Sequence, residues 1–432
     1  MTETTAPLPA IESPRIDRLR AGLKRRYARE ARFRAYGLLA IAVAVGFLLL
    51  LLGRIVEQGH TAFYTHTVTT AVYMDPARID RGYPQGANFA QLVAEQQLAR
   101  LGVQDDPQGT KATEMRRLFS SELTFQAAAL IARQPGLIGQ TVAIAAPASD
   151  DADLFFKGEI TKATPEDQRR LSDQQIDWLE RMDAAGAVRA HFNTGLFTRG
   201  DSTQPELAGV LGAVVGSALM LLVTALIAIP LGVGAALYLE EFAPKGRITD
   251  LIEVNINNLA AVPSIIYGLL GLALFINWMH LPRASPLVGG LVLALMALPT
   301  IIIATRSSLK AVPPSIREAA LAMGASKTQT VFQHTLPLAM PGVMTGAIIS
   351  MAHALGETAP LLLIGMVSFV PGVAHGLAEP TGTLPSLVYI WENASERAFH
   401  ERTAAAILVL LAFMIVMNAA AILLRRRFER RW

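Results

Sequence analysis

Long uncharged runs dominate the pattern of hydrophobic and polar positions along the chain. A helix needs about 20 mostly apolar residues to cross a bilayer. Because no water satisfies backbone groups inside lipid, each run of that length predicts a helix. We expect six transmembrane helices, near residues 35–55, 207–236, 254–276, 285–305, 338–364 and 403–424. The fifth of these runs is interrupted by Pro341, His353, Glu357 and Pro360.

Composition agrees with a membrane protein. Of the 432 residues, 52% are apolar and 17% are charged, whereas soluble chains average about 25% charged residues. The absence of cysteine excludes disulfides, thiolate metal sites and cysteine catalysis. The sequence contains no Walker motif, metal-ligand cluster, nucleophile triad or nucleic-acid module. We therefore expect no catalytic, cofactor-binding or metal-binding residues, no nucleic-acid partner and no enzymatic activity of the chain itself.

Lysine and arginine distribution predicts the orientation of these helices. Both tails and the loop 306–337 are rich in Lys and Arg, which favours the cytoplasmic side. The predicted parts are a basic cytoplasmic tail (1–34), a first membrane helix (35–56), an outer or periplasmic insert (57–206), a membrane core (207–424) and a cytoplasmic tail (425–432). The first helix is expected to be an uncleaved anchor, because a long basic segment precedes it. Apolar positions at three- or four-residue spacing from Ile16 to Ala31 fit either a helix lying on the inner leaflet or a solvated basic tail.

The insert 57–206 has the pattern of a small α+β domain. Alternation over His66–Val72 predicts a strand, and Thr141–Ala146 predicts another. Helical spacing predicts helices over Phe89–Gly102, Ala112–Arg133 and Ser172–His191. The scattered His60, His66 and His191 are interpreted as surface histidines, and the residues of the insert do not indicate its function.

The loop 306–337 carries the most informative local pattern. Pro313 and Pro314 end the incoming helix, and Ser315 is expected to cap a new short one. Gly324 permits a left-handed turn. A second helix then runs to Leu336, where Pro337 opens the next membrane helix. The pattern predicts a compact pair of helices presented to the cytoplasm.

Small and acidic residues mark one side of this pair. Glu318 lies near the start of the short helix, where the helix dipole favours an acid, and Ala319 and Ala320 leave room for a partner surface. Glu318-Ala319-Ala320, then Gly324, then Leu336-Pro337, is similar to the E-A-A…G…L-P signature of binding-protein-dependent ABC importer permeases. In that family the loop is the coupling helix that docks into a cleft on the cytoplasmic ATPase. The resemblance implies that these residues, with a helix over 316–326, form the ATPase-coupling segment.

Further segments narrow the resemblance. Met351–Leu361, which contains G-E-T-A-P-L, and Val262–Leu269, which contains V-P-S-I-I-Y-G, resemble the A-type permease subunit of phosphate importers. The long insert after the first helix resembles the extended form of that subunit. The resemblance covers about residues 200–430 and implies a six-helix permease fold. It also implies the partners: a second permease subunit, two ATP-binding subunits and a periplasmic phosphate-binding protein, with inorganic phosphate as substrate.

Two ionisable residues fall inside a predicted membrane helix, where such groups are costly and commonly functional. His353 and Glu357 are four residues apart, so they share one helical face and can satisfy each other inside the bundle. Relatives usually carry an arginine in place of His353. We hypothesise that Glu357 pairs with His353 or with a basic residue of the partner permease at the translocation pathway; a purely structural pair is the alternative. Arg306 is either a positive-inside residue or a residue at the pathway exit.

The sequence thus predicts an all-α membrane protein with six helices of the ABC importer permease type and an α+β extracytoplasmic insert. We expect a multi-pass permease subunit of an ATP-driven phosphate importer in the inner membrane, surrounded by membrane lipid and without a cofactor. The alternatives are a permease for another oxyanion, a membrane sensor with a periplasmic domain, and a secondary transporter.

Overall fold

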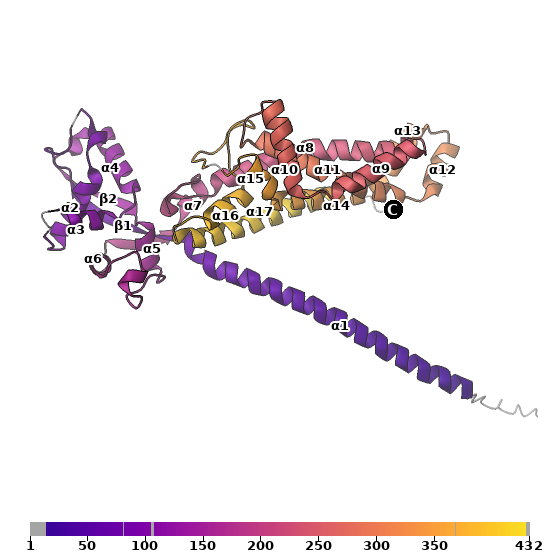
Figure 1. The fold of residues 1–432 in the computed structure, drawn as a ribbon, viewed down its shortest axis with the longest axis horizontal. Helices are drawn as coiled ribbons and strands as arrows, with labels where there is room; N and C mark the ends of the chain where they lie inside the picture. Colours follow the sequence, from indigo (N-terminus) through magenta and orange to yellow (C-terminus); the bar gives the residue numbers. More distant parts are fainter. Residues whose placement is uncertain (1–13, 81, 105–107, 368, 429–432) are drawn as a thin grey trace, which may run out of the picture. The chain divides into compact units, whose positions relative to one another are not determined.

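The computed structural model describes residues 14–80, 82–104, 108–367 and 369–428 (Figure 1). Residues 1–13 and 429–432 of the two predicted tails therefore lie outside the described residues. The chain separates into two units, residues 1–57 and residues 58–432. Within the described residues, five helices are long and apolar enough to cross a membrane, and a bent helix pair brings the number to six if it counts as one crossing. The predicted all-α membrane protein with an α+β insert is confirmed.

The first unit is built by one helix, α1 (Pro14–Gly59). It runs without a break through the predicted basic helix and the first membrane helix, which the sequence suggested as two separate elements. Its apolar side chains, such as Leu39, Phe47 and Leu50, are exposed along its length. This is the surface that a helix surrounded by lipid presents. Whether the basic half lies on a leaflet stays a prediction.

A three-stranded antiparallel sheet with strand order β2-β1-β3 organises the insert. The central strand β1 (Tyr64–Tyr73) pairs with β2 (Thr141–Pro147) on one side and with β3 (Val188–Phe192) on the other. Val68 of β1 lies opposite Ala146 of β2 and Val188 of β3. Alternate positions of β1 are buried, Val68 and Val72 among them, as the alternation in the sequence predicted.

Short helices pack against this sheet and form the core of the insert. They are η1 (His60–Phe63), η2 (Pro84–Gly86), α2 (Phe89–Arg100), α3 (Thr110–Arg116), α4 (Glu122–Arg133), η3 (Pro135–Leu137), α5 (Asp150–Phe156), η4 (Glu166–Gln168), α6 (Asp173–Ala184), α7 (Thr194–Thr198) and η5 (Pro205–Leu207). The predicted helix over Ala112–Arg133 is wrong, because the chain turns after Arg116 and starts a new helix at Glu122. The predicted helix over Ser172–His191 ends at Ala184, and His191 lies in β3, since Gly186 adopts a left-handed conformation that breaks the helix.

The permease-like core follows, with long helices side by side (Figure 1). In chain order the elements are α8 (Leu211–Leu237), the π-helical η6 (Tyr238–Phe242), α9 (Arg247–Ala260), α10 (Ser264–Gly271), the π-helical η7 (Leu272–Trp278), α11 (Pro286–Lys310), α12 (Pro314–Ala322), α13 (Lys327–Gln329), the π-helical η8 (Thr330–Thr335), α14 (Leu336–Gly356), α15 (Ala359–Leu363), α16 (Leu384–Glu392) and α17 (Ala398–Phe428). Helix α11 makes its most extensive contacts with α8 and also packs against α14. Small residues permit this approach, since a Cβ on Gly290 of α11 would lie 2.5 Å from Val223 of α8.

Two predicted membrane helices need correction. The run 254–276 is not one straight helix, because the chain bends by 100° between α9 and the helix that starts at Ser264. Pro263 causes the break, since it lacks a backbone N–H and adopts an extended conformation. The run 338–364 ends at Gly356, where Glu357 is extended and Pro360 follows. At its other end, α14 begins at Leu336 with Pro337 in its first turn, as predicted, and it continues the helical stretch that starts at Lys327. The π-helical segment η8, which directly precedes α14, accommodates the proline ring within that stretch.

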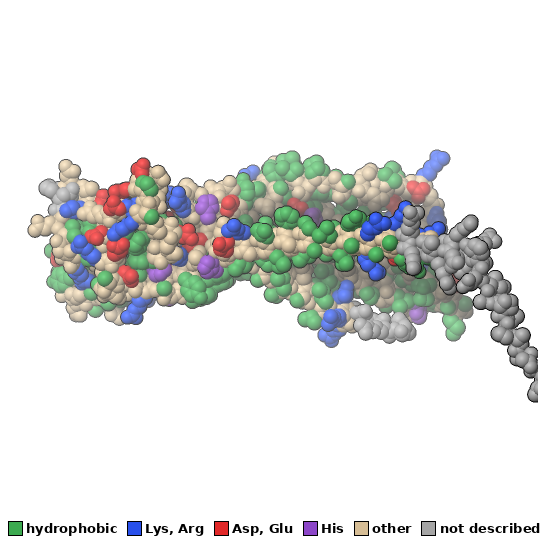
Figure 2. Space-filling view, turned by 90° about the horizontal axis from the view of Figure 1, so that it is seen from below, with side chains coloured by type: hydrophobic (Ala, Val, Ile, Leu, Met, Phe, Trp, Pro, Cys, Tyr) green, Lys and Arg blue, Asp and Glu red, His purple; other side chains and the backbone are tan. Residues whose placement is uncertain are grey.

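The surface of the molecule reflects this division. Hydrophobic side chains run along the long helices, whereas acidic and basic side chains are mixed over the insert (Figure 2). The exposed apolar residues of the core include Leu222, Leu226 and Leu231 of α8. A surface of this kind is stable only against lipid or another apolar chain.

Candidate functional site

The loop between α11 and α14 contains the short helix α12 that the motif predicts. Pro313 precedes it in an extended conformation and Pro314 occupies its first position, so the expected cap at Ser315 is wrong. Gly324 has a φ of +88°, which confirms the predicted left-handed turn. Ser326 then begins the next helix, and its side chain accepts a hydrogen bond from the backbone N–H of Gln329. The segment is thus a defined turn between two helices.

The motif residues do not share one surface. Glu318 and Ala319 are exposed on α12, whereas Ala320 lies on the buried side of the same helix. The expectation that both alanines leave room for a partner is therefore correct only for Ala319. Leu336 and Pro337 are half-buried in the continuous helix that follows, some distance along the chain from α12. The exposed part of the motif is extended by Leu321 and Met323, whose side chains face outward.

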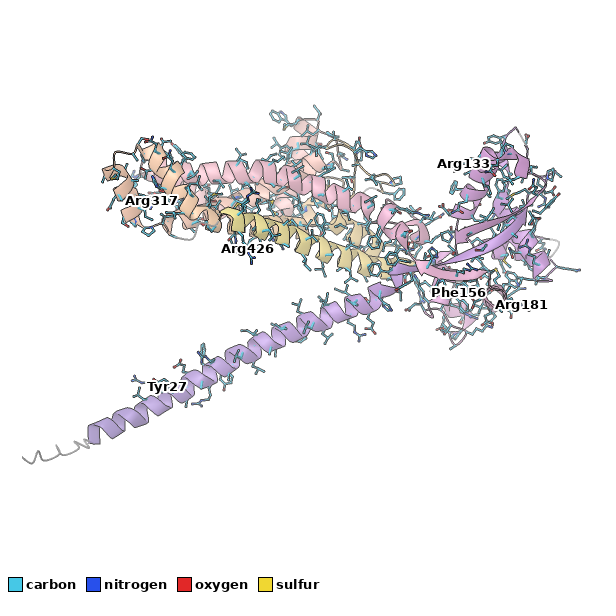
Figure 3. All side chains as sticks on the ribbon, turned by 180° about the vertical axis from the view of Figure 1, so that it is seen from behind. Tyr27, Arg133, Phe156, Arg181, Arg317 and Arg426 are labelled. Carbon is cyan, nitrogen blue, oxygen red and sulfur yellow. The ribbon has the colours of Figure 1, made fainter. Side chains whose placement is uncertain are left out.

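Arg317 fixes α12 to the ends of two long helices, and Figure 3 labels it at the loop end of the core. Its guanidinium donates to Glu241 Oε1 from Nη2 at 2.7 Å and from Nε at 3.1 Å. It also donates to the carbonyl oxygens of Leu309 and Val312, both at 2.8 Å. Glu241 belongs to the π-helical segment η6 that follows α8, and Leu309 is near the end of α11. Arg317 therefore joins α8, α11 and α12 at one point.

Arg306 forms a second charged cluster at the same end of α8 and α11. Its Nη2 lies 2.8 Å from Glu253 Oε2 of α9, and its Nε lies 3.4 Å from Glu240 Oε2. Lys310 lies 3.7 Å from the same Glu240 oxygen. Arg306 therefore connects α11, where it lies, to α9 and to the turn after α8. Sequence reasoning missed Glu240, Glu241 and Glu253, although adjacent acids at the end of one span and arginines at the end of another are the signal that pairs them.

The predicted pair of His353 and Glu357 is present. His353 Nε2 and Glu357 Oε1 are 3.2 Å apart. The side chain of Glu357 is 19% exposed but that of His353 is 67% exposed, so the pair is not enclosed within the bundle of this chain. The helix ends between the two residues, which places Glu357 just beyond the last turn of α14.

The histidines of the insert differ from one another. His60 and His191 are exposed, as expected, whereas His66 is half-buried and its Nδ1 lies 2.9 Å from Asp153 Oδ1. Among the residues that the structure describes, no group of three or more His, Cys, Asp or Glu residues could hold a metal ion.

Comparison with known families identifies the core. A family model described as binding-protein-dependent transport system inner membrane component matches residues 228–432. A model of a domain of unknown function, DUF3333, matches residues 20–166, which include most of helix α1 and most of the insert. Together, the membrane helices, the exposed coupling-type loop and the matching model define an inner-membrane component of a transport system.

Individual relatives specify the branch. The phosphate transport system permease protein PstA 1 of Mycobacterium tuberculosis (strain CDC 1551 / Oshkosh) is 34% identical over 229 residues, which cover 52% of this chain and 74% of the relative. The probable ABC transporter permease protein YqgI of Bacillus subtilis (strain 168) is 36% identical over 157 residues, 36% of this chain and 52% of YqgI. A solved inward-facing MetNI methionine ABC transporter has a TM-score of 0.41 and 20% identity, covering 50% of this chain and 95% of that chain. The chain belongs to the family of PstA-like transport system permeases, which are multi-pass inner-membrane proteins.

Proposed function

We propose that this chain is a permease subunit of an ATP-driven phosphate importer. It forms the translocation pathway with a second permease subunit, two ATP-binding subunits drive it, and a periplasmic phosphate-binding protein delivers inorganic phosphate. The observation that carries the proposal is the E-A-A motif on an exposed short helix in a chain that is 34% identical to a phosphate permease. ATP hydrolysis then belongs to the separate subunits, and this chain contributes movement of its helices.

The proposed orientation places α12 in the cytoplasm and the insert outside. The insert ends at the start of α8, while Arg317 of α12 binds Glu241 at the other end of that helix. The two parts thus lie at opposite ends of one membrane helix, as the domains 57–206 and 306–337 require. The tails 1–34 and 425–432 are then cytoplasmic.

A labelling experiment tests the orientation. The chain has no cysteine, so single cysteines can be introduced without other changes. Met323→Cys on the coupling loop and Phe125→Cys on the insert are both at exposed positions. A membrane-impermeant maleimide added to spheroplasts should label the Phe125→Cys variant, and should label the Met323→Cys variant only after lysis. Labelling of Met323→Cys from outside would contradict the proposed topology.

Coupling to the ATPase is proposed to run through α12 and the turn after it. Glu318 and Ala319 form the exposed surface, Gly324 shapes the turn, and Leu336-Pro337 link the segment to the next membrane helix, whereas Ala320 supports α12 from beneath. Ala319→Cys should crosslink to an ATP-binding subunit in the assembled complex, and Phe125→Cys should not. A complex that shows phosphate uptake but never forms the Ala319→Cys crosslink would contradict this role for α12.

The translocation pathway is proposed to include His353 and Glu357, with Arg306 at its inner exit. The exposed His353 is available to the partner permease, and Glu357 is held beside it. Competition of labelled phosphate uptake by unlabelled phosphate, but not by phosphonate or molybdate, supports phosphate as the substrate. Equal competition by another oxyanion would favour the alternative permease. Uptake without an ATP-binding subunit would favour a secondary transporter, and an intact complex that transports no anion would favour a sensor.

A further inference from the structure

The insert has no assigned function, and its contacts with the membrane core suggest one. Hydrogen bonds join the insert and its connection to α8 with the α16–α17 end of the core, among them one from Arg170 to the carbonyl oxygen of Ser395 at 3.5 Å. Lys157, directly after α5, donates to Glu401 Oε1 of α17 at 2.6 Å. Trp391 of α16 donates from Nε1 to Asp201 Oδ1 at 2.9 Å. Arg402 of α17 donates to the carbonyl oxygen of Ala208, just before α8, at 3.0 Å.

Lys157 is the centre of a buried charged network. Its Nζ lies 2.7 Å from Asp153 Oδ2 as well as 2.6 Å from Glu401 Oε1, and the three side chains are at most 8% exposed. His66 of β1 holds the other oxygen of Asp153 through its backbone N–H at 2.8 Å and its ring at 2.9 Å. Burial alone would raise the pKa of Asp153, but the bonds from His66 and the Lys157 charge outweigh it and keep that pKa below its ordinary value. The network therefore connects the central strand of the insert to the start of α17 through charged groups.

A buried ion pair of this kind specifies one arrangement of the parts it joins. The desolvation cost of two buried charges is repaid only when their geometry is kept, and removal of one partner leaves an uncompensated charge. The Lys157–Glu401 contact can thus form in one seating of the insert on the core. Any other arrangement of the insert on the core would leave one of the two charges buried without its partner, or would expose it to water and lose the attraction between the pair.

Apolar packing continues across the same boundary. Ala398 of α17 belongs to the buried cluster of the insert that contains Trp178 and Leu179. A second cluster joins Ala62 and Leu196 of the insert to Trp391 and Phe399 of the core. Close-packed interiors transmit displacement rather than absorb it.

The connection from the insert to α8 is held by backbone hydrogen bonds. The backbone N–H of Gly209 donates to the carbonyl of Gly200 at 2.8 Å, and that of Leu211 donates to Arg199 at 3.1 Å. Val210 likewise donates to Leu196 of α7 at 2.7 Å. The segment 199–211 is therefore folded against the insert and does not behave as a flexible linker.

We propose that the insert is a rigid outer extension of α16 and α17, and that the Asp153–Lys157–Glu401 network is the joint that holds it in place. A load applied to the insert from outside is then carried to the start of α17 instead of being lost in a hinge. The inference rests on the proposed function only for its uptake measurement, because the seating of the insert can be measured in any assembled complex.

Crosslinking tests the rigidity. Arg170 of the insert and Glu396 of the core line the same open cavity of about 570 Å³, and the chain has no other cysteine to interfere. In the Arg170→Cys/Glu396→Cys variant, a short bismaleimide should join the two parts, and the joined complex should take up phosphate like the same variant treated with a monofunctional maleimide. Loss of uptake only on joining shows that the insert must move against the core and overturns the inference. An unmodified complex without phosphate uptake would instead refute the proposed function.

Disruption of the joint tests the network. Lys157→Met should lower the crosslinking yield by at least about tenfold, because the cost of leaving a buried charge without its partner exceeds that of a tenfold change in an equilibrium. It should also increase hydrogen exchange over 150–160 and 396–405. Lys162→Met is the matched control, since Lys162 and Glu180 form an ion pair at 2.7 Å in which both side chains are half exposed. Glu401→Gln breaks the joint from the core side and covers the case in which Lys157→Met fails to fold. Unchanged yield and exchange in both joint variants would overturn the assignment of the network as the joint.

Discussion

Replacement of Arg317 by methionine is the sharpest test of how α12 is fixed to the membrane helices. The guanidinium makes four hydrogen bonds, two to Glu241 and one each to the carbonyls of Leu309 and Val312. The side chain of Glu241 is only 9% exposed, so it would lose its partner without gaining full hydration. Loss of one partner of a buried pair costs about 3–5 kcal/mol. Arg317 itself is 23% exposed, which places the expected cost near the low end, at about 3 kcal/mol.

The functional consequence follows from the position of this contact. Arg317 lies on the helix that is proposed to receive the ATPase. Glu241 lies in η6 directly after α8, Leu309 lies in the last turn of α11, and Val312 follows α11. Without the guanidinium, α12 is held to these helices by the chain at Ala311–Pro313 and by the packing of Ile316 against the apolar cluster that contains Leu237 and Leu309. We therefore expect Arg317→Met to lower phosphate uptake more than it lowers ATP hydrolysis by the assembled complex.

A double-mutant cycle separates this contact from a general loss of stability. Glu241→Gln removes the acid, so the double variant carries no unpaired charge and should be more stable than the two single costs predict, by about 2 kcal/mol. The free energy of unfolding in detergent, ATP hydrolysis and uptake are measured for each variant. Arg283→Met is the control, because Arg283 is exposed and precedes the opposite end of α11. Additive unfolding energies, or equal losses of uptake and hydrolysis, would refute the reasoning.

Three further predictions follow from other parts of the structure. Burial raises the pKa of Glu206 from its ordinary 4.5 to about 7. Because the folded chain then binds this proton more tightly than the unfolded chain, the stability of the insert should fall by up to about 3 kcal/mol as the pH rises from 4.5 to about 7. Glu206→Gln should flatten this pH dependence in thermal melts. Gly216→Ala places a Cβ 2.6 Å from Thr381 Oγ1 and should lower assembled complex in the membrane, whereas Gly234→Ala meets nothing within 4 Å and should be neutral or slightly stabilising. His353→Ala and Glu357→Ala should each lower uptake by roughly tenfold at equal membrane abundance, the scale of one lost charge-assisted contact, and unchanged uptake in both would exclude them from the pathway.

Features with a local physical cause could be predicted from the sequence. The spans around α8, α11 and α17 follow from uncharged runs, β1 follows from alternation, and the left-handed turn at Gly324 follows from the freedom of glycine. The pairing of His353 with Glu357 follows from their four-residue separation, although α14 ends between them. Each of these depends on residues within a few positions of one another.

The wrong predictions have a common cause: single residues or distant partners override the helix that an uncharged or periodic run predicts. Pro263 bends the third predicted span although the uncharged run continues past it. Glu357 and Pro360 end α14 inside a run that is otherwise apolar, and helical spacing over Ser172–His191 hid the strand β3, which forms only because β1 lies beside it. The ion pairs of Arg317 and Lys157 join residues that are distant along the chain, so no local pattern contains them.

The contacts near the insert and the contact that holds α12 lie at the two ends of α8, and this limits how the protein can couple its two sides. At the end nearer the insert, Arg402 of α17 binds the carbonyl of Ala208, three residues before α8 begins, and Lys157 binds the neighbouring Glu401. At its other end, α8 passes into the turn that carries Glu241, which binds Arg317 of α12. Between them α8 packs along α11 with close contacts such as Gly290 on Val223. One helical stretch, Leu211–Phe242, therefore connects the contact of α12 to the connection between the insert and α8. We infer that the insert and the coupling helix act on the same element from its two ends, so that stiffness of α8 and α11, rather than contact between the two sites, sets the coupling.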